Sequence, residues 1–202
     1  MTGSAHLAVS RETAQRLDVL AAMVTRWNPV INLVAAGSLA ALRDRHIADS
    51  LQLVSLAQTP RHWADLGSGG GFPGLVVAAA LAERVPDCRI SLVESDGRKA
   101  AFLRSAAQAM QLAVTVHAVR VEALAPLRAD VVSARALAPL PALLPLVRRH
   151  LAPHGVALLP KGARHADEVA AARQSFRFRY LAHPSSTAAD SVILAVSEID
   201  DA

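Results

Sequence analysis

Apolar residues recur along the chain with the period of an α-helix in some stretches and of a β-strand in others. Near the N-terminus they fall on one helical face behind Ser10, a favourable N-cap, which predicts a first helix over residues 10–26. Pro29 disfavours helical backbone at the residue before it, so we expect an irregular linker over residues 27–33. A second helical pattern occupies residues 38–54. These two helices precede the first strand and are expected to form a cap.

From residue 61 onward, short apolar runs typical of strands alternate with helical patterns. The expected strands are 63–66, 89–94, 114–118, 129–134 and 155–160, and the expected helices are 73–83, 97–111, 140–149 and 165–174. This alternation predicts a parallel sheet with helices on both faces. Two last strands, 176–181 and 191–197, have no helix between them and should form an antiparallel hairpin. We expect an α/β, doubly wound, mostly parallel seven-stranded sheet, with a helical cap (1–60) integrated with the core (61–202).

The most distinctive stretch of the chain runs Trp63-Ala64-Asp65-Leu66-Gly67-Ser68-Gly69-Gly70-Gly71-Phe72-Pro73-Gly74. It predicts a buried strand that ends in an acidic residue, followed by a glycine-rich turn that opens a helix. Glycine permits positive φ and lets a ligand lie against bare backbone, while a proline suits the first helical position. The turn is therefore the first candidate for a ligand site.

Two ligand classes use a turn of this kind, and they differ in where the pattern begins. Read from Gly69, the sequence Gly-x-Gly-x-x-Gly matches the dinucleotide-binding fingerprint. Read from Asp65, the acid and the alternating glycines Gly67, Gly69 and Gly71 are typical of class I S-adenosylmethionine-dependent methyltransferases. The second interpretation is favoured, because the first would place Asp65 and Ser68 in strand positions that should be apolar. A carboxylate there could also bind the cationic sulfonium and ammonium groups of S-adenosylmethionine.

Composition and charge limit the possible classes of protein and of binding partner further. The 202 residues are 52% hydrophobic, enough for one well-buried domain. With no apolar run long enough for a membrane span and no signal peptide pattern, we expect a cytoplasmic protein. The single cysteine, Cys88, excludes an internal disulfide, and no metal-ligand spacing is present, so no metal is expected. The 21 basic residues, nearly all arginine, outnumber 17 acidic ones and favour a polyanionic partner, although GC-rich coding explains the arginines equally well.

Several segments in order resemble one family, the small-subunit (16S) ribosomal RNA 7-methylguanosine methyltransferases, also called glucose-inhibited division protein B. The matching segments are Arg26-Trp27-Asn28-x-x-x-Asn32-Leu33, Arg45-His46-Ile47-x-Asp49-Ser50-Leu51, the glycine-rich turn, Ala134-Arg135-Ala136 and Lys161-Gly162. The resemblance implies a class I methyltransferase fold and methyl transfer from S-adenosylmethionine to the ring nitrogen at position 7 of a guanine. It also implies that the substrate is small-subunit ribosomal RNA, either free or within the assembled 30S subunit. We expect a monomer.

The resemblance and the glycine pattern together predict the cofactor-binding residues. They are Asp65, Gly67, Gly69, Gly71, Phe72, Glu94, Ser95, Asp96, Val121, Glu122 and Arg135. Glu94, at the tip of the second strand, suits the ribose hydroxyls, with Ser95 and Asp96 beside the adenine. The alternatives are an ordinary strand-end acid for Glu94, a helix-start charge for Glu122 and a surface salt bridge for Arg135.

Methylation of guanine at position 7 needs alignment more than acid–base catalysis, since that nitrogen carries an unprotonated lone pair at neutral pH. No general base is therefore required. Exocyclic amine methyltransferases carry Asn/Asp-Pro-Pro-aromatic after the fourth strand, which residues 133–137 lack, and Cys88 lies too early for the nucleophile of a cytosine enzyme.

The candidates for holding the RNA are mostly basic or amide side chains near the expected carboxyl edge of the sheet and in the cap. They are Asn28, Asn32, His46, Arg120, Arg135 and Lys161. Turn capping by the asparagines and burial of His46 against backbone remain alternatives. For the whole protein, two other functions stay open: an NAD-dependent oxidoreductase, and an RNA-binding protein that has kept the fold without catalysis.

Overall fold

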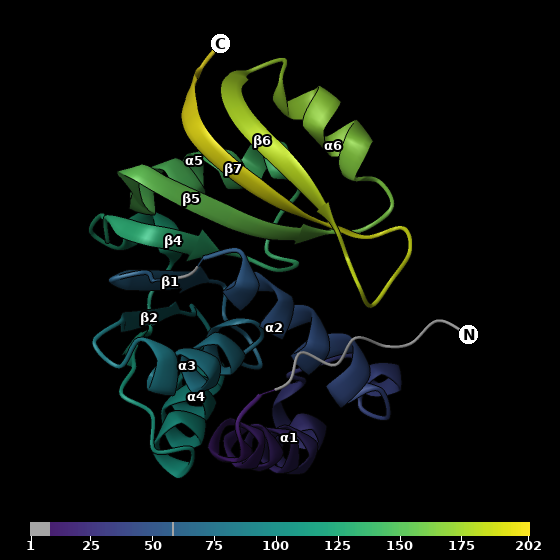
Figure 1. Ribbon diagram of the computed structural model, residues 1–202, viewed down its shortest axis with the longest axis vertical. Coiled ribbons are helices and arrows are strands. Elements are labelled where there is room, and N and C mark those ends of the chain that lie inside the picture. The colour runs from purple at the N-terminus through teal and green to yellow at the C-terminus, as the bar shows by residue number, and fades with distance from the viewer. Residues whose placement is uncertain (1–8, 58) are drawn as a thin grey trace.

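The computed structural model describes residues 9–57 and 59–202, which are built around one seven-stranded sheet (Figure 1). The strands are β1 (His62–Leu66), β2 (Arg89–Val93), β3 (Thr115–His117), β4 (Ala129–Ser133), β5 (Leu151–Lys161), β6 (Phe176–Pro184) and β7 (Val192–Asp201). Their order is β3-β2-β1-β4-β5-β7-β6; the first five are parallel, and β7 runs antiparallel to both of its neighbours. The predicted mostly parallel sheet with a C-terminal hairpin is confirmed.

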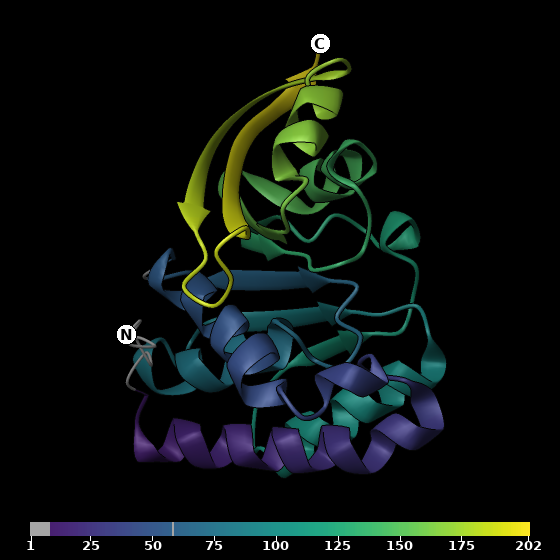
Figure 2. The ribbon, with the colours of Figure 1, turned by 90° about the vertical axis from the view of Figure 1, so that its right-hand side faces the viewer.

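Helices cover both faces of the sheet. Successive residues of one strand join different hydrophobic clusters, as Trp63 and Ala64 do in β1, because strand side chains alternate between faces. One cluster is covered by α1 (Arg11–Ile31), α2 (Ala48–Ser55), α3 (Gly74–Arg84) and α4 (Gly97–Ala109), and the other by α5 (Leu140–His150) and α6 (His165–Ala172). In Figure 2, α1 lies along the bottom of the molecule. Among the described residues, no helix has the length and apolar character needed to cross a membrane.

The first helix is longer than the sequence predicts. It runs through Pro29 to Ile31, so the prediction of an irregular linker over residues 27–33 was wrong for its first five positions. Asn28 and Ile31 are buried and continue the inward stripe of the helix. Burial of this stripe against α3 and α4 outweighs the local penalty for helical backbone before a proline.

The second predicted helix, over residues 38–54, also begins differently. A 3₁₀ turn over Ala36–Ser38 comes first, and a π-helix over Leu42–Ile47 then leads into α2. Leu42 and Ile47 are both buried, and the wider turn of a π-helix, with its i→i+5 hydrogen bonds, brings residues five apart towards one face. The wider turn therefore lets two apolar side chains reach the core where an α-helical turn would separate them.

Candidate active site

The polar crevice of the molecule lies where the strand order reverses. β1 and β4 are neighbours in the sheet, but β2 and β3 intervene in sequence, so the loops after β1 and β4 diverge at their carboxyl ends. A cavity of about 320 Å³ occupies this position. The predicted site residues that line it are Gly67, Gly69, Glu94, Ser95, Arg120, Val121, Glu122 and Arg135. Segments far apart in the sequence are thus brought to one crevice, here called the cofactor crevice.

The glycine-rich turn is open towards the crevice because its backbone carries no side chains there. Gly67, Gly69 and Gly71 have φ values of 72°, 51° and 86°, in the left-handed region that favours glycine. The N–H of Gly67 donates to the carbonyl of Val93 over 2.9 Å, which ties the turn to β2. A Cβ on Gly67 would lie 2.8 Å from Cδ1 of Leu137, so even alanine at this position requires a shift.

Asp65 lies in the protein interior and stabilises the glycine-rich turn through hydrogen bonds. It is fully buried, and its two oxygens accept hydrogen bonds from the Ser133 hydroxyl at 2.7 Å and the Gly74 N–H at 3.1 Å. The indole N–H of Trp63 donates in turn to the Ser133 hydroxyl at 2.9 Å. Burial raises the pKa of Asp65 to about 6, because loss of solvation disfavours its charged form. The carboxyl group therefore joins β1, β4 and the start of α3.

Glu94 lines the cofactor crevice at the end of β2. Its oxygens accept from the N–H groups of Gly69 at 2.9 Å and Asp96 at 2.8 Å. Because a carboxylate offers about four lone-pair sites, both oxygens can still accept from a ligand's hydroxyl groups. Asp96 instead caps α4, accepting from the N–H groups of Arg98 and Lys99, and these bonds lower the pKa of its carboxyl group.

Arg135, just after β4, is a half-buried cation. Its guanidinium carbon lies 5.6 Å from the centre of the Phe72 ring. Within residues 9–57 and 59–202 the guanidinium forms neither a hydrogen bond nor an ion pair. Burial lowers its pKa, while the charges of Asp49 and Asp65 act in the opposite direction. A guanidinium whose donors are all available suits an anionic or carbonyl oxygen on a ligand.

A second cavity, of about 180 Å³, adjoins the crevice at Arg135, which lines both. It is bounded by Asp49 and Gln52 of the α2 segment, by Lys161 at the end of β5 and by the loop that joins β6 to β7. We call it the acceptor pocket. The predicted residue Lys161 lines this pocket, but its ammonium group is already bound to Glu168 at 2.8 Å and to the carbonyl of Ala138 at 3.1 Å.

The two predicted asparagines of the cap lie outside both cavities as the described residues define them. Asn28 is buried, and its side-chain oxygen accepts from the N–H of Val34 at 2.8 Å. Asn32 is exposed and closes α1 with a φ of 49°, in the left-handed region. Their observed contacts are with the backbone of the cap.

His46 packs against Phe72 in the glycine-rich turn. Its ring lies 5.3 Å from that of Phe72 and is inclined to it by 30°. Neither buried ring nitrogen has a hydrogen-bond partner among the described residues. Loss of solvation is the main cause that lowers the pKa of His46 to about 4, and the positive charge of Arg135 adds to it. The imidazole is therefore neutral at pH 7.

Sequence reasoning did not select Asp49 and Gln52 as site residues, although Asp49 belongs to the segment Arg45-His46-Ile47-x-Asp49. That segment could have indicated a second part of the site, because it matches the family pattern outside the glycine-rich turn. The contribution of the β6–β7 loop had no comparable local signal. Its hydrogen bonds to α2 join residues more than 130 positions apart.

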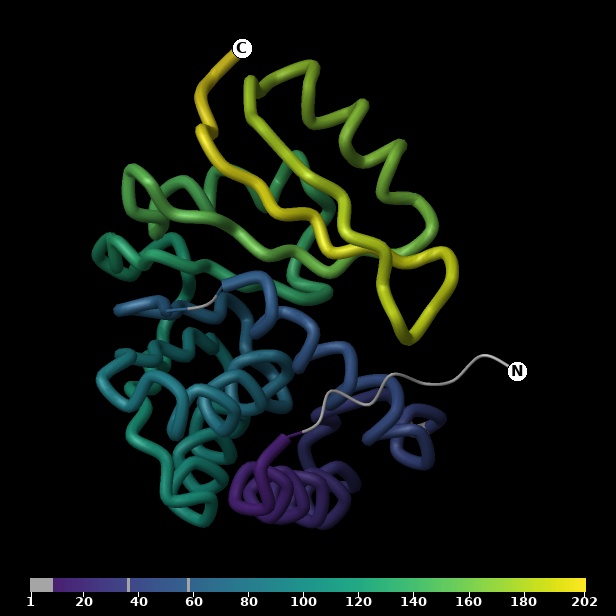
Figure 3. The backbone as a smooth tube through the Cα atoms, in the orientation of Figure 1, coloured from purple at the N-terminus to yellow at the C-terminus, as the bar shows by residue number. Residues whose placement is uncertain are grey.

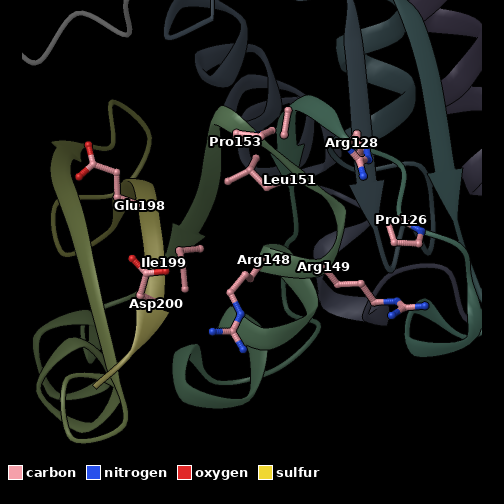
Figure 4. A pocket seen from close by; sticks show the side chains of 10 residues that line it. Pro126, Arg128, Arg148, Arg149, Leu151, Pro153, Glu198, Ile199 and Asp200 are labelled. Carbon is pink, nitrogen blue, oxygen red and sulfur yellow. The ribbon is translucent and has the colours of Figure 1, made fainter.

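A larger groove, of about 620 Å³, lies at the opposite ends of the strands (Figure 4). It is lined by residues near the starts of β4 and β5 and the end of β7. Three of its charged side chains already have partners, and Glu198 pairs with Arg179 at 2.9 Å. Arg148 pairs with Asp201 at 2.9 Å, and the Arg149 guanidinium donates to the carbonyl of Leu124. This groove is thus separate from the carboxyl edge of the sheet. Among the described residues, no cluster of histidine, cysteine and acidic side chains could hold a metal.

Comparisons with known proteins agree with this arrangement. The O-methyltransferase from Bacillus cereus in complex with SAH superposes with a TM-score of 0.61 at 15% identity, covering 98% of this chain and 95% of that one. A TehB-like SAM-dependent methyltransferase from Corynebacterium glutamicum gives 0.60 at 15% identity, with 92% and 98% covered. These similarities confirm the predicted class I methyltransferase fold.

Sequence relatives are much closer. A ribosomal RNA small subunit methyltransferase G from Cereibacter sphaeroides is 53% identical over 93% of this chain and 91% of its own length. The protein of the same name from Ruegeria pomeroyi is 48% identical, with 96% and 95% covered. Residues 13–193 match the GidB family model, described as rRNA small subunit methyltransferase G. The family predicted from the sequence is confirmed, and this chain belongs to the GidB family.

Proposed function

We propose that this protein transfers the methyl group of S-adenosylmethionine to the ring nitrogen at position 7 of a guanine in small-subunit ribosomal RNA. The observation that carries the proposal is the pair of adjoining cavities that share Arg135. One cavity has the lining for a nucleoside and the other has room for an acceptor. Membership of the GidB family supports the assignment of the RNA substrate.

The groups that line the cofactor crevice are chemically suited to S-adenosylmethionine. Glu94 keeps lone pairs for the ribose hydroxyls, and Val121 is an apolar neighbour for an adenine ring. Gly67 lines the crevice without a side chain, so the methionine portion would lie along its backbone. Asp65 would hold this turn in shape without touching the cofactor.

When bound, S-adenosylmethionine would supply a methyl group bonded to a positively charged sulfur. The lone pair of the guanine nitrogen would bond to the methyl carbon while the carbon–sulfur bond breaks, so that S-adenosylhomocysteine leaves with that electron pair and no proton is transferred. The residues of this chain therefore need to align the reactants rather than move a proton. Arg135, between the two cavities, would bind an oxygen of the target nucleotide. Arg120 is exposed and would meet the RNA backbone at the entrance of the crevice.

The cap would support the acceptor side. Asn28 and Asn32 fix the end of α1 through backbone contacts, and His46 would hold the Phe72 ring under Arg135. We expect these residues to act by positioning the cap. The protein would work as a cytoplasmic monomer on either free RNA or the assembled 30S subunit.

The test uses purified protein, isotope-labelled S-adenosylmethionine and small ribosomal subunits from cells that lack this protein. We expect label in 7-methylguanosine at one position of the ribosomal RNA, detected by nucleoside analysis and by chain cleavage at the modified base. Replacement of that guanine with 7-deazaguanine should abolish labelling. Label in another nucleoside or in protein would contradict the proposal, and no incorporation at all would favour an RNA-binding protein without catalysis.

A further inference from the structure

We infer that the acceptor pocket is the subsite for the target guanine and that Asp49 reads the base through its N1–H and exocyclic 2-amino group. The inference rests on the proposed function and deepens it, because it names the part of the site that distinguishes guanine from other bases. Asp49 lines this pocket and is half-buried. A carboxylate is an acceptor-only group when ionised, which suits an edge made of two adjacent donors.

The order of groups along the site matches the order of groups around a guanine ring. Going from the cofactor crevice into the acceptor pocket, one meets first the glycine-rich turn, then Arg135 and then Asp49. From the methylated nitrogen of guanine, the ring edge presents the oxygen at position 6, then N1–H, then the 2-amino group. A base whose reactive nitrogen faces the crevice therefore brings its oxygen to Arg135, a pairing that arginine makes well with guanine. Its donor edge then reaches Asp49.

One oxygen of Asp49 is used within the protein and the other is available. Oδ1 accepts hydrogen bonds from the Thr187 hydroxyl, from the Gln52 amide at 3.3 Å and from the Ser185 hydroxyl at 3.5 Å. Oδ2 accepts none from the part of the chain that the structure describes. Fixing one oxygen restricts the rotation of the carboxylate, so Oδ2, with about two lone-pair sites, is held ready for both donors of the base.

The loop between β6 and β7 forms the other wall of the pocket. In Figure 3 it descends from the hairpin to the side of α2. The Ser186 N–H donates to the Gln52 side-chain oxygen at 2.7 Å, and the Ser185 N–H donates to the Ser191 carbonyl at 2.8 Å. These bonds anchor the loop beside the pocket. The space of about 180 Å³ equals roughly six water volumes, which is the scale of a single base.

The lining also explains why other bases would be excluded. Adenine has an amino group where guanine has its oxygen, and this group would place donors against the donors of Arg135. Adenine also lacks the N1–H, which would leave Asp49 with a desolvated charge and no partner. Specificity would thus come from both an attractive and a repulsive contact at each of the two residues.

The test compares guanine with inosine at the methylated position, after that position has been mapped. Inosine keeps the reactive nitrogen, the oxygen and N1–H but lacks the 2-amino group. Loss of one hydrogen bond to a charged group predicts that the wild-type protein prefers guanine by about 10- to 100-fold in kcat/KM. In the Asp49→Asn variant this preference should fall to within about threefold of unity, because the donors of Gln52, Ser185 and Thr187 hold the amide oxygen and turn its NH2 group towards the base.

Two matched variants distinguish recognition of the base by Asp49 from the contribution of Asp49 to the position of the β6–β7 loop. Asp44→Asn is the same substitution at an exposed site of the preceding π-helix and should leave the guanine preference at its wild-type value. Thr187→Val removes a loop contact and keeps the Asp49 carboxylate, so it should slow both substrates alike. Calorimetric binding of S-adenosylmethionine by Asp49→Asn, expected at the wild-type affinity, verifies that its cofactor crevice is intact.

The outcomes distinguish the subsite from the proposed function. A wild-type protein that methylates guanine and inosine equally contradicts the subsite without reference to any variant. So does an Asp49→Asn variant that keeps the full guanine preference. A wild-type protein that methylates no guanine in the small subunit contradicts the proposed function itself.

Discussion

The two cavities on either side of Arg135 are built in different ways. The cofactor crevice is formed by segments that follow β1, β2, β3 and β4, and its glycine-rich turn is fixed by hydrogen bonds to the end of β2. The acceptor pocket is assembled from α2, the end of β5 and a loop near the C-terminus, held by long-range contacts. The glycine-rich motif therefore marks the cofactor side in the sequence, whereas no local pattern links the parts of the acceptor side.

The largest effect should come from Gly67→Asp. The new side chain would meet Leu137 at a φ of 72° and place a charge in the cofactor crevice. Steric overlap of this side chain with the cofactor should lower S-adenosylmethionine affinity at least about 100-fold, equivalent to about 2.8 kcal/mol. Calorimetry of the variant checks this, with Gly37→Asp as control, since no atom lies within 4 Å of a Cβ there. Retained affinity in Gly67→Asp would move the cofactor elsewhere, and RNA binding should survive in either case.

Arg135→Lys should sharpen the comparison, because Arg135 is shared by both cavities. Lysine keeps the charge but cannot reproduce the planar fork of donors. We expect loss of one charged hydrogen bond, about 1.5–3 kcal/mol, or a roughly 10- to 150-fold decrease in kcat/KM on ribosomal subunits. Steady-state kinetics with each substrate varied in turn measure it. An effect confined to the Michaelis constant of the cofactor would show that Arg135 serves only one cavity.

A smaller effect is expected from Lys161→Met, which alters only the wall of the acceptor pocket. The variant leaves Glu168 without its ion pair, and the free energy of unfolding should fall by about 1–2 kcal/mol, because both groups are only partly screened by solvent. Urea denaturation of this variant, of Glu168→Gln and of the double variant gives the coupling between them. S-adenosylmethionine affinity should not change. A weaker cofactor would mean that the two cavities are less independent than the geometry indicates.

The effect that is smallest at neutral pH is the pH dependence due to His46, because its contribution changes only below pH 6.5. Its pKa of about 4 in the folded protein lies below the usual 6.5, so the unfolded chain binds the proton first. The contribution of His46 to stability is therefore complete above pH 6.5 and is lost as the pH falls towards 4. The difference in unfolding free energy between wild type and His46→Phe should decline over that window in urea titrations. Asp65, whose raised pKa acts with the opposite sign, is common to both proteins and cancels.

A difference that does not vary between pH 7 and pH 4 would contradict the buried, neutral state of His46. The matched comparison is needed because many carboxyl groups titrate over the same range.

The contrast between the cavities also decides what the sequence could reveal. The glycine-rich turn and Glu94 were predictable because a few adjacent residues determine their backbone and their place at a strand end. The contacts of Asp49 with Thr187 were not, since residues 138 positions apart carry no local signal of their pairing. Pro29 is a case in which a local sequence signal gave a wrong prediction. Its local preference is real, but burial of the α1 stripe prevails.

The most direct test of the paired cavities is a crystal structure with S-adenosylhomocysteine and 7-methylguanosine monophosphate. We predict the ribose of the cofactor product at Glu94 and the methylated base between Arg135 and Asp49, with its methyl group facing the sulfur. A cofactor product outside the glycine-rich turn, or a base bound away from Asp49 and Arg135, would contradict the account.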